Sequence, residues 1–117
     1  MHITERRIGD ATLLTLSGRL VFDDGDDEVR THVSRLIDEG RVRIILDLQH
    51  VSYMDSCGVG VLISRFVSAR RRGGDIGLLN PSPRCLHVMQ ISQLLGVFQV
   101  FESEDQALAD AGARRVP

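Results

Sequence analysis

An apolar run, followed by a polar turn and then a helical pattern, constrains the fold of this chain more than any other feature. Residues 44–48 read Ile-Ile-Leu-Asp-Leu and predict a buried strand. Residues 56–72 carry apolar side chains at helical spacing. Asp55 and Ser56 lie where the strand's approach gives way to the helix, and both are residue types that cap helices. The sequence therefore predicts a strand–turn–helix unit with two polar residues at its turn.

Ser56 is open to two interpretations. In the first, it serves only as a helix cap, and the residues alone favour this interpretation because most serines at helix starts do nothing else. Alternatively, it is a modification site, since two glycines in the first turn leave little bulk around its hydroxyl. The amino end of a helix favours negative charge, so the fold would tolerate a phosphate there.

The rest of the chain alternates strands and helices after an initial strand pair. The predicted elements are strands over 3–8 and 11–22 with a bulge at Gly18, a helix over 27–39 capped by the acidic loop 23–27, a strand over 42–48, the helix over 56–72, a strand over 76–79, a short helix from 83, a strand over 97–101 and a helix over 103–111. This order predicts an α/β fold, with a mixed central sheet of about four to five strands and about four flanking helices. The length fits one domain over 1–117, with a core over 3–111 and a frayed tail over 112–117.

Composition argues against several classes of function. The net charge of −2 gives no drive toward nucleic acid. No apolar run could span a bilayer and residues 1–7 lack the apolar core of a signal peptide, so we expect a cytoplasmic protein. Cys57 and Cys85 lack metal-ligand spacing and are expected to stay as thiols. We expect neither a metal nor a cofactor.

Enzyme chemistry also finds little support. A nucleophile elbow needs glycine two residues before its serine, and position 54 is Met. The chain contains no lysine, which excludes a Walker phosphate-binding loop. Cys57 lies at a helix start, where a thiol pKa can fall, but the motif offers no resolving partner. We therefore predict a protein that is not an enzyme, and rank catalysis by Ser56 or Cys57 last.

The helix over 56–72 has two distinct sides. One side carries apolar residues that should face the sheet: Val59, Leu62, Ile63, Phe66 and Ala69. The other side carries Cys57, Val61, Ser64, Arg65, Ser68 and Arg72. That second side is either an ordinary solvated surface or a docking face that is apolar near Ser56 and rimmed by arginines.

The turn resembles the signature of a known family. Asp55-Ser56-Cys57-Gly58-Val59-Gly60 is similar to the Asp-Ser-Ser-Gly-(Leu/Val)-Gly pattern that opens a long helix in STAS domains. The closest likeness is to the stand-alone bacterial anti-sigma factor antagonists. Residues 16–20, 69–74, 80–83 and 98–108 fit the same family, so the resemblance covers nearly the whole chain.

The resemblance implies a phosphorylation switch. The unphosphorylated protein would bind an anti-sigma factor of the ATP-binding serine-kinase fold and so free a sigma factor. Phosphorylation of the serine that matches Ser56 would end the binding, and a PP2C-type phosphatase would restore it. Cys57 replaces the second serine of the family's pair, which leaves Ser56 as the only candidate acceptor within the motif.

The expected contacts with the partner gather at this turn. The predicted contact set is Asp55, Ser56, Cys57, Gly58, Val61, Ser64 and Arg65, with Asp23 and Asp24 as weaker candidates. Direct binding to nucleic acid is not expected, and weak homodimer formation is left open. The alternative function is a STAS scaffold subunit of a sensory complex, or a cytoplasmic subunit of a membrane transport system, without a phosphorylation switch.

Overall fold

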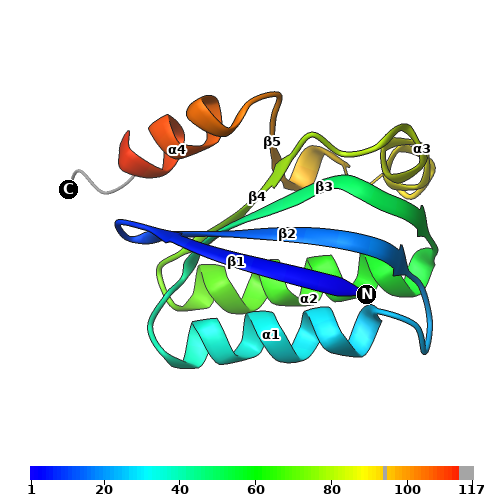
Figure 1. Ribbon diagram of the computed structural model, residues 1–117, viewed down its shortest axis with the longest axis horizontal. Helices are drawn as coiled ribbons and strands as arrows, with labels where there is room; N and C mark the ends of the chain where they lie inside the picture. The colour runs from blue at the N-terminus through cyan, green and yellow to red at the C-terminus, as the bar shows by residue number, and fades with distance from the viewer. Residues whose placement is uncertain (94, 114–117) are drawn as a thin grey trace.

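The computed structural model describes residues 1–93 and 95–113, and a five-stranded sheet forms its centre (Figure 1). The strands are β1 (His2–Ile8), β2 (Ala11–Leu20), β3 (Arg43–Met54), β4 (Asp75–Leu79) and β5 (Gln99–Phe101), and they lie side by side in that order. β1 runs antiparallel to β2, and the other neighbours pair in parallel. The predicted mixed sheet is confirmed, with β3 at its centre.

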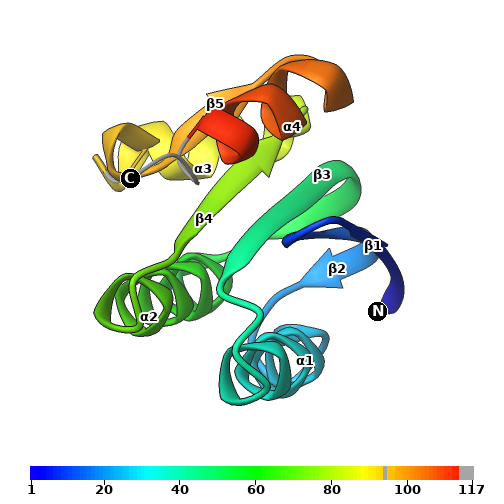
Figure 2. The same ribbon diagram turned by 90° about the vertical axis from the view of Figure 1, so that its left-hand side faces the viewer.

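Helices cover the sheet unevenly. They are α1 (Asp26–Asp38), α2 (Ser56–Arg71), α3 (Pro83–Ile91) and α4 (Glu104–Ala113), with a 3-10 turn over Leu95–Val97. α1 and α2 lie together on one face, while α3 and α4 lie on the other side (Figures 1 and 2). The larger apolar core lies between the sheet and the α1–α2 layer and extends to Cys85 and Met89 of α3. A smaller core under α4 joins Leu13, Ile45 and Leu79 to Phe101 and Ala107.

The central strand is longer than its sequence predicts. β3 does not end at Leu48 but runs on to Met54, although Gln49, His50 and Ser52 are exposed polar residues. The extension pairs with the second half of β2, whose register shifts around Ser17 and again after Gly18. The predicted bulge at Gly18 is therefore confirmed. Because β3 continues this far, it leads directly into the turn at the start of α2.

The start of α1 differs from the prediction in its cap. The N-cap residue is Gly25, in the left-handed region at φ 96°, and no side chain caps this helix. A side chain at Gly25 would collide with the carbonyl oxygen of Arg19, so the position suits only glycine. Acidic residues still occupy the first turn, where their negative charge interacts favourably with the helix dipole, as expected: Asp26, Asp27 and Glu28.

α2 buries a wider arc than its sequence pattern predicts. Val59, Leu62 and Ala69 are buried as expected. Val61 is also buried, with 2% of its surface exposed, because α1 packs alongside α2. The side of α2 that remains in solvent carries Ser56, Cys57, Gly60, Val67, Arg70 and Arg71.

The carboxyl-terminal boundary also needs a correction. α4 continues to Ala113, two residues beyond the predicted helix end at position 111. The remaining tail residues, 114–117, lie outside the described residues. Within the part of the chain that the structure describes, no helix is both long enough and apolar enough to cross a membrane.

Candidate functional site

Asp55 connects two segments at the carboxyl end of the sheet. It is the N-cap of α2, and its Oδ1 accepts a hydrogen bond of 3.0 Å from the backbone N–H of Gly58. Its Oδ2 accepts one of 3.0 Å from the backbone N–H of Phe22, in the loop between β2 and α1. One carboxylate thus caps the helix and fixes the neighbouring loop.

These contacts keep Asp55 ionised. Partial burial on its own would raise the pKa of Asp55, but backbone N–H donors from Phe22, Gly58 and Cys57 together outweigh it, and the net pKa lies below the usual value. The start of α2 therefore already holds one negative charge at neutral pH.

The cap assignment excludes one of the two interpretations of Ser56. Asp55 performs the capping, and Ser56 is the first residue of the helix. Its side chain is exposed. The interpretation of Ser56 as no more than a cap is wrong, and its hydroxyl lies at the surface beside the amino end of α2.

The two glycines of this turn have different roles. Gly58 is buried, and a side chain there would collide with the carbonyl oxygen of Leu20 at the end of β2. Gly60 is exposed, and a methyl group there would meet no atom within 4 Å. Gly58 allows α2 to approach the sheet closely, whereas Gly60 leaves the surface beyond Ser56 flat.

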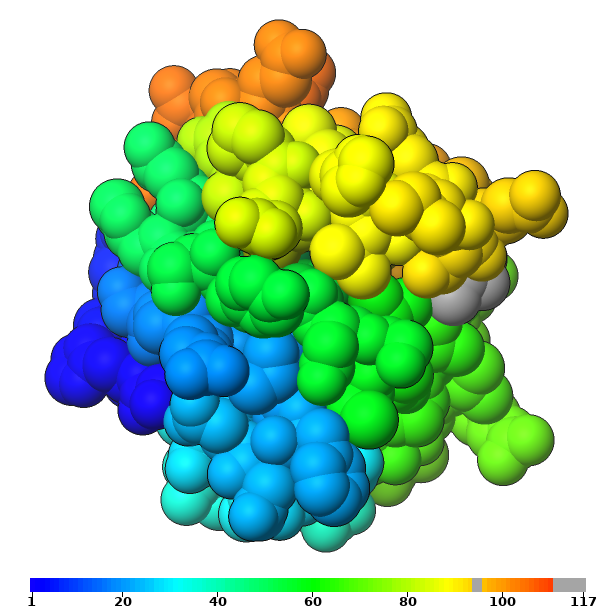
Figure 3. All heavy atoms as spheres, turned by 90° about the vertical axis from the view of Figure 1, so that its right-hand side faces the viewer, coloured from blue at the N-terminus to red at the C-terminus, as the bar shows by residue number. Residues whose placement is uncertain are grey.

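Aromatic and basic side chains surround this turn on the surface. Phe22 is 71% exposed in the loop after β2, and Tyr53 is half exposed at the end of β3. The guanidinium carbon of Arg84 lies 4.7 Å from the centre of the Tyr53 ring, and that of Arg19 lies 6.0 Å from it. Figure 3 shows the segments around residues 20–25 and 52–60 and the start of α3, in blue, green and yellow, meeting on one face.

The residues predicted to contact a partner fall into an exposed group and a buried group. Asp55, Ser56 and Cys57 lie together, and the exposed Asp23 and Asp24 follow Phe22 in the adjoining loop. Gly58 and Val61 are buried, so the expectation that they touch a partner directly is corrected: the close approach of β2 and of α1 covers them.

Ser64 and Arg65 serve the packing of α2. The Ser64 hydroxyl donates to the Val61 carbonyl at 3.0 Å. The Arg65 guanidinium donates to the Ser34 hydroxyl of α1 at 2.7 Å, which joins the two helices. Both side chains are partly buried and lie two or more turns beyond Ser56.

Four surface residues of this site do not follow from the sequence pattern: Phe22, Tyr53, Gly60 and Arg84. The pattern places Phe22 within a strand and does not distinguish Gly60 from Gly58. The positions of Tyr53 and Arg84 depend on the extension of β3 and on the docking of α3. The Ser82 hydroxyl fixes that docking, since it donates to the Val51 carbonyl at 2.9 Å. Only the aromatic character of Phe22 and Tyr53 was visible as a signal.

The two cysteines are free thiols in different settings. Cys57 is exposed beside Ser56, and Cys85 is buried in α3. Burial raises the pKa of the Cys85 thiol, and its bonds with Ser82 offset this only in part. Cys85 is therefore a packing residue, as its spacing from Met89 suggests.

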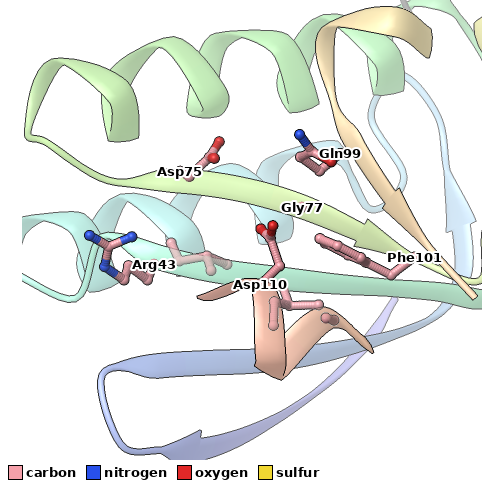
Figure 4. A pocket seen from close by; sticks show the side chains of 9 residues that line it. Arg43, Asp75, Gly77, Gln99, Phe101 and Asp110 are labelled. Carbon is pink, nitrogen blue, oxygen red and sulfur yellow. The ribbon is translucent and has the colours of Figure 1, made fainter. Parts of the chain in front are cut away.

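Two other features of the described chain bear on the choice of site. Residues 1–93 and 95–113 contain no group of three or more His, Cys, Asp or Glu side chains that could hold a metal ion. A small cleft under α4 lies among Arg43, Asp75 and Asp110 (Figure 4), with room for about one water molecule. All three side chains already have interaction partners. This cleft lies at the amino ends of β3 and β4, away from Ser56.

A comparison with known families decides which family this fold and turn represent. The sequence model of the STAS domain family matches residues 2–107. The chain belongs to the STAS domain family. An anti-sigma F factor antagonist from Lysinibacillus sphaericus is 37% identical over 83 residues, which cover 70% of this chain and 70% of that protein.

Solved structures agree with this assignment. The anti-sigma factor antagonist SpoIIAA in its unphosphorylated form has a TM-score of 0.82 at 27% identity, over 96% of this chain and 97% of that one. The Bacillus cell fate determinant SpoIIAA in the phosphorylated form has a TM-score of 0.74 at 28% identity, over 93% and 98%. This STAS protein is therefore a member of the anti-sigma factor antagonist family. That family is non-enzymatic, which confirms the prediction that the chain is not an enzyme.

Proposed function

We propose that this protein is an anti-sigma factor antagonist that is switched by phosphorylation of Ser56. Its unphosphorylated form binds an anti-sigma factor of the serine-kinase fold and so releases a sigma factor. The observation that carries the proposal is that Asp55 caps the helix while the Ser56 side chain stays exposed. A kinase can reach that hydroxyl without unfolding the helix.

The physical effect of phosphate at this position supports a switch. A phosphoserine carries a charge close to −2 at neutral pH, and the helix dipole offsets part of it within the protein's own fold. Asp55 beside it is already ionised and already uses the N–H of Gly58. Burying the added dianion against a partner would therefore cost much binding free energy.

The relatives support the same proposal. The Lysinibacillus protein is named an anti-sigma F factor antagonist, and SpoIIAA has been solved in both unphosphorylated and phosphorylated forms. We extend the binding of an anti-sigma factor to this chain, with Ser56 as the acceptor and Asp55 and Cys57 beside it in the contact surface. A PP2C-type phosphatase would complete the cycle.

Intact mass spectrometry tests the acceptor residue. The protein is incubated with ATP and the serine-kinase anti-sigma factor from the same organism, as wild type, as Ser56→Ala and as Ser52→Ala. Ser52 is the matched control, because it is an exposed serine four residues away whose hydroxyl bonds to the Gly18 carbonyl. We expect one added phosphate on wild type and on Ser52→Ala, and none on Ser56→Ala.

Other results would change the proposal in defined ways. Phosphate on Ser56→Ala would show that the acceptor is another residue. Binding of the anti-sigma factor without any phosphate would indicate a scaffold of the same fold that does not switch. Absence of both binding and phosphate with every serine-kinase anti-sigma factor of the organism would refute the function.

A further inference from the structure

Phe22 is the most exposed large apolar side chain in the described part of the molecule, with 71% of its surface in solvent. It lies in the loop that Asp55 ties to the start of α2. We propose that Phe22 is the anchor of the docking surface and inserts into an apolar pocket, rimmed by Arg or Lys, on the anti-sigma factor. This inference rests on the proposed function, since it names the chemistry of that same partner's surface.

The loop around Phe22 is held in one conformation. The Phe22 backbone N–H donates to Asp55. On either side of Phe22, the backbones of Val21 and Asp24 bond to each other twice, at 3.0 Å each. Asp23 and Gly25 both have positive φ angles, of 58° and 96°. A side chain that is fixed before binding loses less conformational entropy on docking than a side chain on a mobile loop.

The fixed backbone gives Phe22 the properties of an interface anchor. A phenylalanine exposed to this extent leaves a large apolar surface in water, which a partner's pocket would remove. Aromatic side chains that fill such pockets often contribute most of the binding free energy of an interface. Within its own fold this side chain contributes little, so its exposure is not explained by packing.

The charges around Phe22 indicate which charge the rim of the partner's pocket should carry. Five acidic residues lie at positions 23–28, of which Asp26 is buried and the other four are exposed. Arginines of this chain pair with two of them, Arg19 with Asp24 at 3.6 Å and Arg30 with Asp27 at 2.6 Å. The loop still presents a negative surface around the aromatic ring. A partner with basic residues around its pocket would complement that surface and speed the encounter.

Asp55 holds Phe22 and Ser56 close enough for one partner to contact both. Its two carboxylate oxygens hold the loop on one side and the helix start on the other. A partner that brings its active site to the Ser56 hydroxyl would therefore also cover Phe22. The anchor and the acceptor would then be recognised together.

Affinity measurements with a matched control test the anchor. Phe22→Ala is compared with Ile91→Ala, because Ile91 is almost equally exposed, at 67%, at the far end of α3. By titration calorimetry with the anti-sigma factor we expect at least a tenfold loss of affinity for Phe22→Ala and less than a twofold change for Ile91→Ala. Both variants should unfold at the same urea concentration as wild type. A change of less than twofold for Phe22→Ala, with wild type binding normally, would overturn the inference and leave the proposed function intact.

A spectroscopic probe tests the pocket directly. The chain has no tryptophan, so Phe22→Trp and Ile91→Trp each carry a single one, which can be labelled with 5-fluorotryptophan. On adding the unlabelled anti-sigma factor, we expect the ¹⁹F resonance at position 22 to shift and lose its sensitivity to exchange from H₂O to D₂O, and the resonance at position 91 to stay unchanged. A resonance at position 22 that stays solvent-sensitive in the complex would contradict insertion. A shift caused by concentrating this protein alone would assign the pocket to a second copy of the chain and overturn the choice of partner.

Salt dependence tests the rim. The affinity of wild type should fall with rising ionic strength, and replacing Asp23 and Asp24 by Asn should flatten that dependence. An equal salt dependence for wild type and the double variant would contradict a basic rim around the pocket.

Discussion

The small residues on the two sides of the first turn of α2 have different roles: on one side they allow close packing, and on the other they leave the surface open. On the side facing the sheet, Gly58 lets the helix approach β2 so closely that no side chain would fit. On the solvent side, Ser56 and Gly60 are exposed and cause no crowding. One side is constrained by folding and the other is left available for function, although their sequence patterns look alike. Substitutions on the two sides should therefore change different observables.

The largest effect on stability should come from Gly58→Ala. Its new methyl group would collide with the Leu20 carbonyl oxygen and crowd Met54, so α2 or β2 must shift. We expect a loss of about 3 kcal/mol in the free energy of unfolding, measured by urea denaturation. Gly60→Ala is the matched control: it should gain about 0.5 kcal/mol, since alanine favours a helix. The same control should weaken binding of the anti-sigma factor several-fold. Equal stability of the two variants would remove the distinction between the two sides.

Substitution of Asp55 should have the second largest effect on stability, because its carboxylate joins the start of α2 to the Phe22 loop. Asp55→Ala removes the helix cap and the bond to Phe22, and should cost about 2 kcal/mol of unfolding free energy. Asp55→Asn keeps one oxygen that can accept from Gly58 but replaces the other by an amide group that cannot accept from Phe22. We expect about half the loss for Asn, by the same denaturation experiment. Identical losses for Ala and Asn would show that the bond to Phe22 alone matters.

The charge of Asp55 makes a third, pH-dependent test. Its pKa is lower in the folded protein than in the unfolded chain, so its contribution is complete above the unfolded pKa of about 4 and is lost as the pH falls through the lower folded value. The stability advantage of wild type over Asp55→Asn should therefore shrink between about pH 5 and pH 2. An advantage that stays constant over this range would mean that the carboxylate charge is not involved.

Arg65 should give the smallest effect, and only on stability. Arg65→Ala breaks the 2.7 Å bond to Ser34 that joins α2 to α1, which should cost about 1 kcal/mol. Binding of the anti-sigma factor should change by less than twofold, because Arg65 lies away from Ser56 along the helix. A tenfold loss of affinity would restore Arg65 to the contact surface that its sequence position suggested.

The sequence could predict the elements of this fold because local signals were strong. The apolar run 44–48 identified the strand and the Asp-Ser turn identified the helix. Gly40, with φ of 86°, follows the end of α1 and is the residue type that commonly ends a helix. The family resemblance added the proposed phosphorylation of Ser56, which capping chemistry alone does not suggest.

The remaining features depend on tertiary packing. Val61 lies on the side of α2 that its sequence pattern predicts to be solvent-exposed, and it is buried in the core where α1 packs alongside α2. β3 continues through polar residues because β2 pairs with them beyond its bulge. The position of the Phe22 loop depends on a hydrogen bond to a residue 33 positions later. No local pattern contains such contacts.

The central claim, that phosphate on Ser56 ends binding, is tested most directly by one pair of titrations. Wild type is phosphorylated at Ser56, purified from the unmodified form, and both forms are titrated into the same anti-sigma factor by calorimetry, with circular dichroism to confirm equal folding. The account predicts that the phosphorylated form folds normally and binds about 100-fold more weakly. Affinities within threefold of each other, with both forms folded, would contradict it.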